Sequence, residues 1–318
     1  MQRGSKDAMD TGSAIAAIDC GTNSTRLLVA DATGRPLERL MRITRLGQGV
    51  DATGSLAPEA IERCLVVLTE FRGVMDGLDV GRGRLAATSA ARDAANGDEF
   101  LRAAGEATGL VPELLSGIDE GRLSMAGAVA QLNPADGPFL VLDIGGGSTE
   151  LIAADGPDDP ELAAVSLQLG CVRLSERFLT GDPPTADELS AAQSEVAAQL
   201  ESAIAAHPRY LSTRRLVGLA GTVSTLASLH LGMEVYDRDR IHHAALAADD
   251  VRGWFERLAA EPTGRRLTRP GMVPGREDVI VGGAMILDAV MQRFGFIECL
   301  VSEADILDGL IASQVVHA

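Results

Sequence analysis

The fold of this chain is decided by the stretch FLVLDIGGGSTELI, residues 139–152. An apolar run ends at the carboxylate of Asp143, three glycines follow, and apolar residues resume after Glu150. This pattern favours two short buried strands joined by a glycine turn, because three consecutive glycines would destabilise a helix. Glycines in such a turn let backbone N–H groups surround a phosphate without interference from a Cβ atom. The stretch therefore predicts a phosphate-binding turn with an acidic residue at its edge.

A second copy of this pattern lies near the N-terminus. The stretch IDCGTNSTRLLVAD, residues 18–31, aligns without gaps on residues 142–155, with identical residues at seven of the fourteen positions. Asp19 therefore occupies the place that Asp143 has in the first stretch. Two related hairpins, each with an acid at its turn, indicate two similar lobes that face each other across a cleft.

In this interpretation the chain divides into a leader and two lobes. Helix-breaking residues cluster at NPADGP, residues 133–138, which is the candidate boundary. We therefore expect a flexible leader over residues 1–13, an N-terminal lobe over 14–134 and a C-terminal lobe over 135–318. The closing helix, predicted over 304–312, is expected to pack back on the first lobe. Alternating strands and helices predict an α/β fold with mixed sheets.

Composition and charge exclude several classes of partner. With 46% apolar and 23% charged residues, the chain has the composition of a soluble globular protein. No apolar run approaches the roughly 18 residues that span a bilayer, and no secretory signal is visible, so we expect a cytoplasmic protein without a membrane partner. The net charge of −17 argues against binding to double-stranded nucleic acid, because that affinity depends on basic surface. Four scattered cysteines lack metal-ligand spacing and are expected to be reduced core thiols: Cys20, Cys64, Cys171 and Cys299.

Three further segments occur in order along the chain: ATSAARD (87–93), SGIDEGRL (116–123) and LDIGGGSTE (142–150). The two phosphate turns, with a third small-residue turn at GLAGT (218–222), resemble the actin/Hsp70/sugar-kinase superfamily. Within it, the three segments resemble the Ppx/GppA family of exopolyphosphatases and guanosine-pentaphosphate phosphohydrolases, over residues 14–312. The resemblance implies two related actin-like ATPase (ribonuclease H-like) lobes with mixed sheets around an interdomain cleft. The chain is similar to the short, two-lobe class of this family known among actinobacteria.

The resemblance implies hydrolysis of the terminal phosphoanhydride of inorganic polyphosphate, dependent on Mg²⁺, with Mn²⁺ as a second candidate. Such chemistry needs donors for the terminal phosphoryl oxygens and positive charge to offset them. Glycines and small polar residues at the turns, with one arginine, are predicted to bind the substrate phosphates: Asn23, Ser24, Arg92, Gly145, Gly146, Gly147, Ser148, Gly221 and Thr222. Hard oxygen ligands for the metal are predicted at Asp19, Asp143 and Glu150.

Glu120 is the predicted general base, because the resemblance puts at this position a glutamate that orients and deprotonates the attacking water. The segment reads Asp119-Glu120-Gly121-Arg122, where the family usually has two glutamates followed by alanine and arginine. This departure leaves open which of the two acids points into the cleft. An acidic pair in the first turn of a helix also stabilises the helix dipole. A base near an anionic substrate is expected to have a raised pKa.

Four functions stay open on the sequence alone. The first is an exopolyphosphatase that prefers short chains, and the second is a phosphohydrolase that converts pppGpp to ppGpp. The third is an ATP-dependent sugar or acetate-type kinase, although no sugar-binding insert is visible. The fourth is a non-catalytic protein that binds alarmones or other nucleotides, against which the intact acids at positions 19, 120, 143 and 150 argue. A homodimer is a further expectation.

Overall fold

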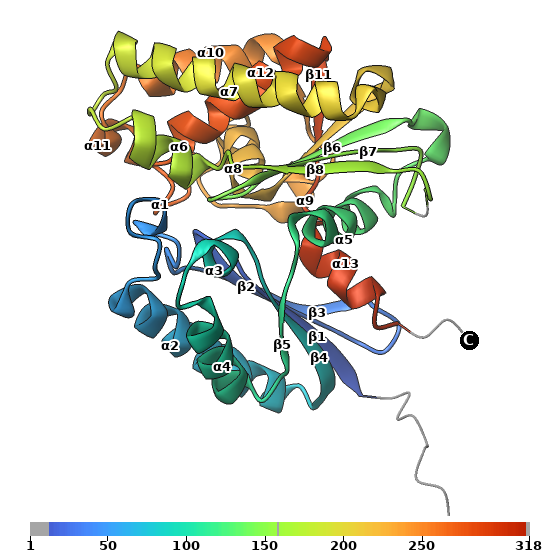
Figure 1. Ribbon diagram of the computed structural model, residues 1–318. Helices are drawn as coiled ribbons and strands as arrows, with labels where there is room; N and C mark the ends of the chain where they lie inside the picture. The colour runs from blue at the N-terminus through green and yellow to red at the C-terminus, as the bar shows by residue number, and fades with distance from the viewer. Residues whose placement is uncertain (1–12, 158, 316–318) are drawn as a thin grey trace, which may run out of the picture.

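The computed structural model describes residues 13–157 and 159–315, so the predicted leader, apart from Ser13, lies outside the described residues. Within these residues the chain forms two mixed sheets, which Figure 1 shows in separate halves of the molecule. The first sheet has the strand order β3-β2-β1-β4-β5 and the second the order β10-β11-β9-β6-β7-β8. The predicted α/β class with mixed sheets is confirmed. The first sheet consists of β1 (Ala14–Cys20), β2 (Ser24–Ala30), β3 (Pro36–Ile43), β4 (Val80–Ala87) and β5 (Pro112–Leu114).

The second sheet and the helices complete the two halves. The second sheet consists of β6 (Phe139–Ile144), β7 (Thr149–Ala154), β8 (Ala163–Leu167), β9 (Arg215–Leu219), β10 (Ala245–Ala247) and β11 (Glu298–Val301). Helices that precede β6 are α1 (Val50–Thr53), α2 (Pro58–Gly77), α3 (Ser89–Asp93), α4 (Gly97–Thr108) and α5 (Gly117–Val129). Helices that follow β8 are α6 (Cys171–Phe178), α7 (Ala186–Ala206), α8 (Ala220–His230), α9 (Arg238–Ile241), α10 (Ala248–Ala259), α11 (Thr263–Leu267), α12 (Ile280–Phe294) and α13 (Ile306–Ala312).

The two related stretches of sequence form equivalent hairpins. β1 pairs with β2 antiparallel and with β4 parallel, while β6 pairs with β7 antiparallel and with β9 parallel. Asp19 lies opposite Arg26 in the first hairpin, and Asp143 lies opposite Glu150 in the second. The repeat read from the sequence therefore corresponds to a repeat in sheet topology.

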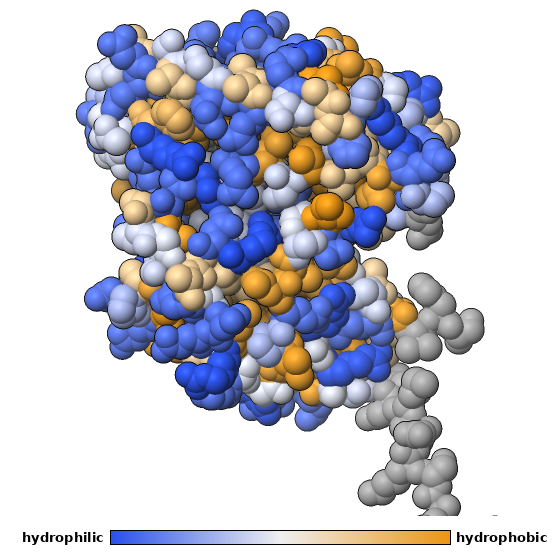
Figure 2. All heavy atoms as spheres, in the orientation of Figure 1, coloured by the Kyte–Doolittle hydropathy of each residue, from blue (hydrophilic) through white to orange (hydrophobic). Residues whose placement is uncertain are grey.

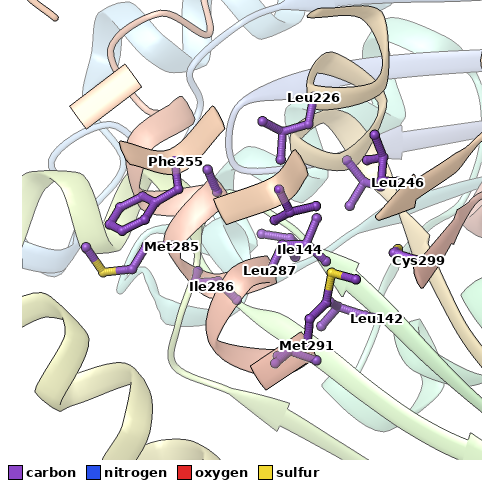
Figure 3. Packing of buried hydrophobic residues seen from close by; sticks show 14 of the residues in the cluster. Leu142, Ile144, Leu226, Leu246, Phe255, Met285, Ile286, Leu287, Met291 and Cys299 are labelled. Carbon is purple, nitrogen blue, oxygen red and sulfur yellow. The ribbon is translucent and has the colours of Figure 1, made fainter. Parts of the chain in front are cut away.

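Alternation along β6 separates core residues from site residues. Leu142 and Ile144 belong to a large buried cluster with α12, and Figure 3 shows them near Leu287 and Met291. Asp143, between them in sequence, points to the opposite face of the sheet, since neighbouring strand residues alternate. That face is covered by α5, which packs against β6, β7 and β8. The strand therefore carries its carboxylate toward α5.

Two helices, α5 and α13, lie between the sheets and pack against each other (Figure 1). α5 precedes the candidate boundary at 133–138 but packs on the second sheet, whereas α13 follows the second sheet but packs on β1 and β2. Their backbones approach closely, because a Cβ atom at Gly127 would lie 2.1 Å from the Asp305 carbonyl oxygen. At Gly309 a Cβ atom would lie 2.1 Å from the Leu123 carbonyl oxygen. The lobe boundary at residue 134 stays a prediction, because a helix before it packs on the second sheet and a helix after it packs on the first.

The surface and the cysteines agree with a folded core in each half. All four cysteines are buried, as expected for core thiols. None of the helices in the described ranges combines the length and the apolar character that a membrane crossing requires. The face seen in Figure 2 is mostly hydrophilic, with smaller groups of apolar residues.

Candidate active site

The two predicted phosphate turns face each other across a pocket of about 80 Å³. The pocket lies between the sheets, with the β1–β2 turn on one side and the β6–β7 turn on the other. Of the residues predicted from sequence, those that line it are Asp19, Asn23, Ser24, Glu120, Asp143, Gly145, Gly146, Gly147, Ser148, Gly221 and Thr222. Arg92 and Glu150 do not line it.

Each turn is closed by its own backbone. The Gly145 N–H donates to the Ser148 carbonyl oxygen at 3.0 Å, and the Gly21 N–H donates to the Ser24 carbonyl oxygen at 3.0 Å. Gly145 therefore uses its N–H in the turn rather than offering it to a phosphate, which differs from the role expected for it. The N–H groups of Gly146 and Gly147 donate no hydrogen bond among the residues that the structure describes. They are backbone donors that this turn leaves for a phosphate.

The glycines also allow the two halves to approach each other. A Cβ atom at Gly146 would lie 2.8 Å from the Thr22 Cβ, and one at Gly147 would lie 2.5 Å from the Ser89 Oγ. Real Cβ atoms do not come so close to other heavy atoms, so any larger residue would force the two sides apart. The glycines were expected only to admit a phosphate. The structure adds a second reason for them, which is contact across the cleft.

Asp143 and Glu150 form a buried acidic pair beside the pocket. The Asp143 Oδ2 accepts a hydrogen bond from the Ser124 Oγ at 2.6 Å, and the Glu150 Oε1 accepts one from the Ser166 Oγ at 2.7 Å. Burial raises the pKa of Asp143 to about 6. Burial, followed by the Asp143 carboxylate, raises the pKa of Glu150 to about 8. A positive charge at this place would favour the ionised forms of both.

Asp19 is joined to an arginine and, through it, to the last helix. The Arg26 Nη2 and Nε donate to the Asp19 Oδ2 at 2.6 and 3.0 Å, and Arg26 also pairs with Asp305 at the N-terminus of α13. Burial raises the pKa of Asp19, although Arg26 opposes this shift. The Asp19 Oδ1 is buried and has no hydrogen-bond partner within the described part of the chain. This oxygen is available for a ligand in the pocket.

Glu120, rather than Asp119, is the acid that points into the pocket. α5 begins after Ser116, whose Oγ accepts from the Asp119 N–H at 3.1 Å, and the Asp119 side chain is 57% exposed. Glu120 is buried at the pocket wall. Burial, and then the carboxylates of Glu150 and Asp143, raise the pKa of Glu120 well above its usual value. The structure thus answers the question that the departure from the family pattern left open.

The next residue, Gly121, fits the same helix turn. A Cβ atom there would lie 3.0 Å from the Ile152 Cγ1, which is tighter than an ordinary contact. Glycine therefore lets the first turn of α5 lie close against β7. The glycine that distinguishes this segment from the family pattern has a packing explanation.

Arg92 contacts the predicted base instead of the pocket. Its Nη1 donates to the Leu115 carbonyl oxygen at 2.8 Å and lies 3.4 Å from the Glu120 Oε2. Its Nη2 is buried without a hydrogen-bond partner among residues 13–157 and 159–315. In this arrangement Arg92 holds the Glu120 carboxylate, and its predicted contact with substrate phosphate stays a prediction.

Among the pocket residues that the sequence did not predict are Thr22 and Arg276. Arg276 lies against Gly221, where a Cβ atom would be 1.0 Å from the Arg276 Nη1. Burial lowers the pKa of Arg276, and its Nε has no hydrogen-bond partner in the described part of the chain. The close fit means that Gly221 makes room for a guanidinium group. Nothing in the sequence around position 276 distinguishes this arginine from a surface residue, apart from its place directly after a Pro-Gly turn.

The acidic residues of the site are suited to hold an Mg²⁺ ion that the substrate phosphates also coordinate. The Asp19 Oδ1 and the Glu150 Oε2 are buried oxygens without a partner in the described residues. Across residues 13–157 and 159–315, no three acidic, histidine or cysteine side chains gather closely enough to hold a metal ion by themselves. Mg²⁺ usually keeps several waters and takes one or two carboxylates together with substrate phosphates. The donor set suits that mode of binding.

A second cavity, of about 530 Å³, adjoins the phosphate pocket. The two share Arg26, Ala220, Gly221 and Arg276, so they meet at the guanidinium groups of the two arginines. Much of the second cavity is lined by apolar side chains: Leu40, Met41, Met233, Met272 and Val273. A flat apolar group could enter this cavity while an attached phosphate occupies the smaller pocket.

Two lobes with matching phosphate turns, and a buried glutamate between them, define a phosphate-handling protein of the two-lobed α/β class. The Ppx/GppA phosphatase family matches residues 28–317. The chain is 42% identical over 315 residues to Exopolyphosphatase 2 of Mycobacterium tuberculosis strain H37Rv, covering 94% of this chain and 98% of that protein. The chain belongs to the Ppx/GppA phosphatase family.

Solved structures agree with this assignment. The crystal structure of an exopolyphosphatase-like protein matches with a TM-score of 0.89 and 34% identity, covering 95% of this chain and 98% of that chain. The Aquifex aeolicus Ppx/GppA family member matches with a TM-score of 0.77 and 31% identity, covering 96% and 99%. The resemblance read from the three sequence segments is confirmed, and so is the fold class that it implied.

Proposed function

We propose that this protein is an exopolyphosphatase that hydrolyses the terminal phosphoanhydride of inorganic polyphosphate and releases orthophosphate. The observation that carries the proposal is the buried carboxyl group of Glu120 at the wall of a pocket between two phosphate turns. A protein that only binds phosphate has no need of a buried carboxylate facing an anion. The 42% identity to a protein named as an exopolyphosphatase supports the same activity.

In this mechanism Glu120 is the general base. The oxygen of a water molecule attacks the terminal phosphorus, its proton passes to Glu120, and the bond from that phosphorus to the bridging oxygen breaks. Orthophosphate leaves, and the shortened chain keeps the bridging oxygen. The raised pKa of Glu120 suits proton transfer near neutral pH. Arg92, at 3.4 Å, keeps the carboxylate oriented toward the pocket.

The terminal phosphate would be bound by donors from both lobes. The N–H groups of Gly146 and Gly147, which have no acceptor within the described residues, face the turn of Asn23 and Ser24, and the guanidinium group of Arg276 lines the same pocket. Mg²⁺ bound by Asp19 and Asp143, with Mn²⁺ as a substitute, would supply positive charge against the phosphoryl oxygens. Glu150, outside the pocket lining, would act on this site through Asp143 or a water.

The decisive experiment measures phosphate release from polyphosphate, pppGpp and ATP, with and without Mg²⁺. Glu120→Gln should reduce release by about 10²- to 10⁴-fold, the usual contribution of a general base. Asp119→Asn is the matched control, since Asp119 is the neighbouring acid on the same helix turn and is exposed. Equal activity of Glu120→Gln and wild type would refute the assigned base. No release from any substrate would favour the non-catalytic binding protein, and phosphate transfer to a sugar or acetate would favour the kinase.

A second candidate function is the hydrolysis of pppGpp to ppGpp. The cavity of about 530 Å³ beside the phosphate pocket, with its apolar lining, favours it, because a guanine ring could enter there. A higher kcat/KM for pppGpp than for polyphosphate would select this candidate. The chain-length preference is tested on polyphosphates of graded length, where we propose that short chains are hydrolysed faster than very long ones.

Two further expectations concern the protein as a whole. We propose that it acts in the cytoplasm and forms a homodimer. Fractionation of the producing cells tests the first, and light scattering at several protein concentrations tests the second.

A further inference from the structure

One arginine of the second lobe binds three different segments at the edge of the pocket. Arg173 lies in α6, and its Nε donates to the Gly147 carbonyl oxygen at 2.8 Å. Its Nη1 donates to the Asp51 Oδ1 at 2.9 Å, and its Nη2 donates to the Asp93 Oδ2 at 2.5 Å. Gly147 belongs to the phosphate turn of the second lobe, whereas Asp51 in α1 and Asp93 in α3 belong to the first lobe. A single side chain therefore connects both sides of the cleft.

This arrangement is more enclosed than an ordinary surface ion pair. The Arg173 side chain is 12% exposed and the Asp51 side chain 16%. Exposed pairs contribute little because water and salt screen them. A guanidinium group has five donors in a planar fork, which lets it bind several acceptors at once in fixed directions. Arg173 uses its three nitrogens on three acceptors, and a lysine ammonium could not reproduce these directions.

The contacts of Arg173 continue into the site on both sides. On the second lobe, the N-terminus of α6 binds the same turn, because the Val172 N–H donates to the Gly146 carbonyl oxygen at 2.9 Å. On the first lobe, the Ser89 Oγ lies 3.3 Å from the Asp93 Oδ2, and Ser89 lines the pocket. Asp93 also follows Arg92, the residue that holds Glu120. Movement of Arg173 would therefore shift the phosphate turn relative to the general base.

We propose that Arg173 is a positioning residue, which holds the phosphate turn of the second lobe against α1 and α3 of the first lobe. The proposal rests on the proposed function in one respect, namely that the turn binds the terminal phosphate. The pocket of about 80 Å³ is lined by residues of both lobes, so the distance between turn and base depends on how the lobes are held together. Arg173 fixes that distance.

The test compares Arg173→Ala and Arg173→Lys with Arg177→Ala. Arg177 is the matched control, since it pairs with the same Asp51 from the same helix, is 44% exposed and does not line the pocket. Phosphate release should fall by about tenfold or more in both Arg173 variants, mainly through kcat, because small misplacements of reacting groups are costly. Arg177→Ala should stay within about twofold of wild type.

A measurement that does not depend on activity separates this inference from the proposed function. Small-angle X-ray scattering of the full chain without ligand should give a larger radius of gyration for Arg173→Ala than for wild type and Arg177→Ala. Asp93→Asn, a milder change at the other end of the contact, should change in the same direction. Wild-type scattering together with wild-type kcat in Arg173→Ala and Asp93→Asn would overturn the proposal. If the wild type releases no phosphate from any substrate, the proposed function fails, and the scattering comparison alone decides whether Arg173 holds the lobes.

Discussion

Asp143 and Glu150 lie directly opposite each other on the antiparallel strands β6 and β7, and both side chains are buried. Two carboxylates in such a place cannot both ionise freely, because burial raises the pKa of both and the Asp143 carboxylate raises the pKa of Glu150 further. They titrate as a pair rather than as independent groups. Ionisation of both carboxyl groups is therefore unfavourable until a cation binds beside them.

We predict that the metal-free protein loses stability as pH rises from about 4.5 to about 8. The folded state keeps the proton of Glu150 up to about pH 8, whereas the unfolded chain loses it near the usual value of 4.5. The folded state binds more protons in this window, so the free energy of unfolding falls with pH. Denaturant unfolding in the presence of a chelator measures the effect. Glu150→Gln should flatten the slope, and added Mg²⁺ should raise stability most at the upper end. A wild-type slope that rises with pH would contradict the pair as described.

Ser124→Ala should raise the pKa of Asp143 above about 6. The Ser124 Oγ donates to the Asp143 Oδ2 at 2.6 Å in a buried setting, so its loss removes a hydrogen bond that favours the ionised form. A hydrogen bond to a charged group contributes roughly 1.5 kcal/mol. Because one pKa unit corresponds to ~1.4 kcal/mol, the pKa of Asp143 should rise by about one. The acid limb of kcat/KM against pH reports the shift. Ser194→Ala, on the exposed face of α7, is the control and should leave the profile unchanged.

Gly147→Ala should impair activity by separating the lobes. Its Cβ atom would meet the Ser89 Oγ at 2.5 Å and the Thr22 Oγ1 at 3.0 Å. The contact lies between the lobes rather than inside one core, so we expect kcat/KM to fall about tenfold or more with a smaller change in stability. Steady-state kinetics and thermal unfolding together measure this. Gly156→Ala has open space around it and serves as the control. Full activity of Gly147→Ala would show that the approach across the cleft is not required.

Gly127→Ala should destabilise the fold by several kcal/mol, because overpacking a close contact is costly and here the obstacle is backbone. A Cβ atom would lie 2.1 Å from the Asp305 carbonyl oxygen, where α5 and α13 cross. Gly253→Ala in α10 is the opposite case, since nothing lies near it, and should stabilise the helix by about 0.5–1 kcal/mol. Urea unfolding midpoints compare the two. A neutral Gly127→Ala would mean that the helices separate easily.

The sequence was most informative where the pattern is local. A repeat of seven identical residues in fourteen was sufficient to predict two equivalent hairpins, because a strand, a glycine turn and a returning strand are all read within one segment. The family pattern indicated Glu120 as the base, but the departure from it at Asp119 and Gly121 left open which acid points into the pocket. The sequence also did not show that α5 covers the second sheet, since a helix shows which side is apolar but not which sheet that side covers.

The site residues that the sequence did not predict depend on contacts between segments far apart in the chain. Arg276 lies in the pocket because Gly221, far away in the sequence, leaves room for its guanidinium group. Thr22 matters because it meets Gly146 and Gly147 of the other lobe. The role of Arg173 cannot be predicted from its own segment, since its three acceptors come from three distant segments. Neither the composition of the sequence nor the spacing of its residues indicates these long-range contacts.

The closing helix has a consequence for how the chain is made. One face of the first sheet, at Ile15, Ala17 and Leu28, is covered by residues of α13. These residues leave the ribosome almost three hundred positions after the strands that they cover. The N-terminal half therefore emerges with an apolar surface that Leu115 and Leu123 cover in part and that α13 completes. Completion of this face has to wait until α13 has been synthesised, so these strands are the part of the nascent chain on which a chaperone that binds apolar segments would act.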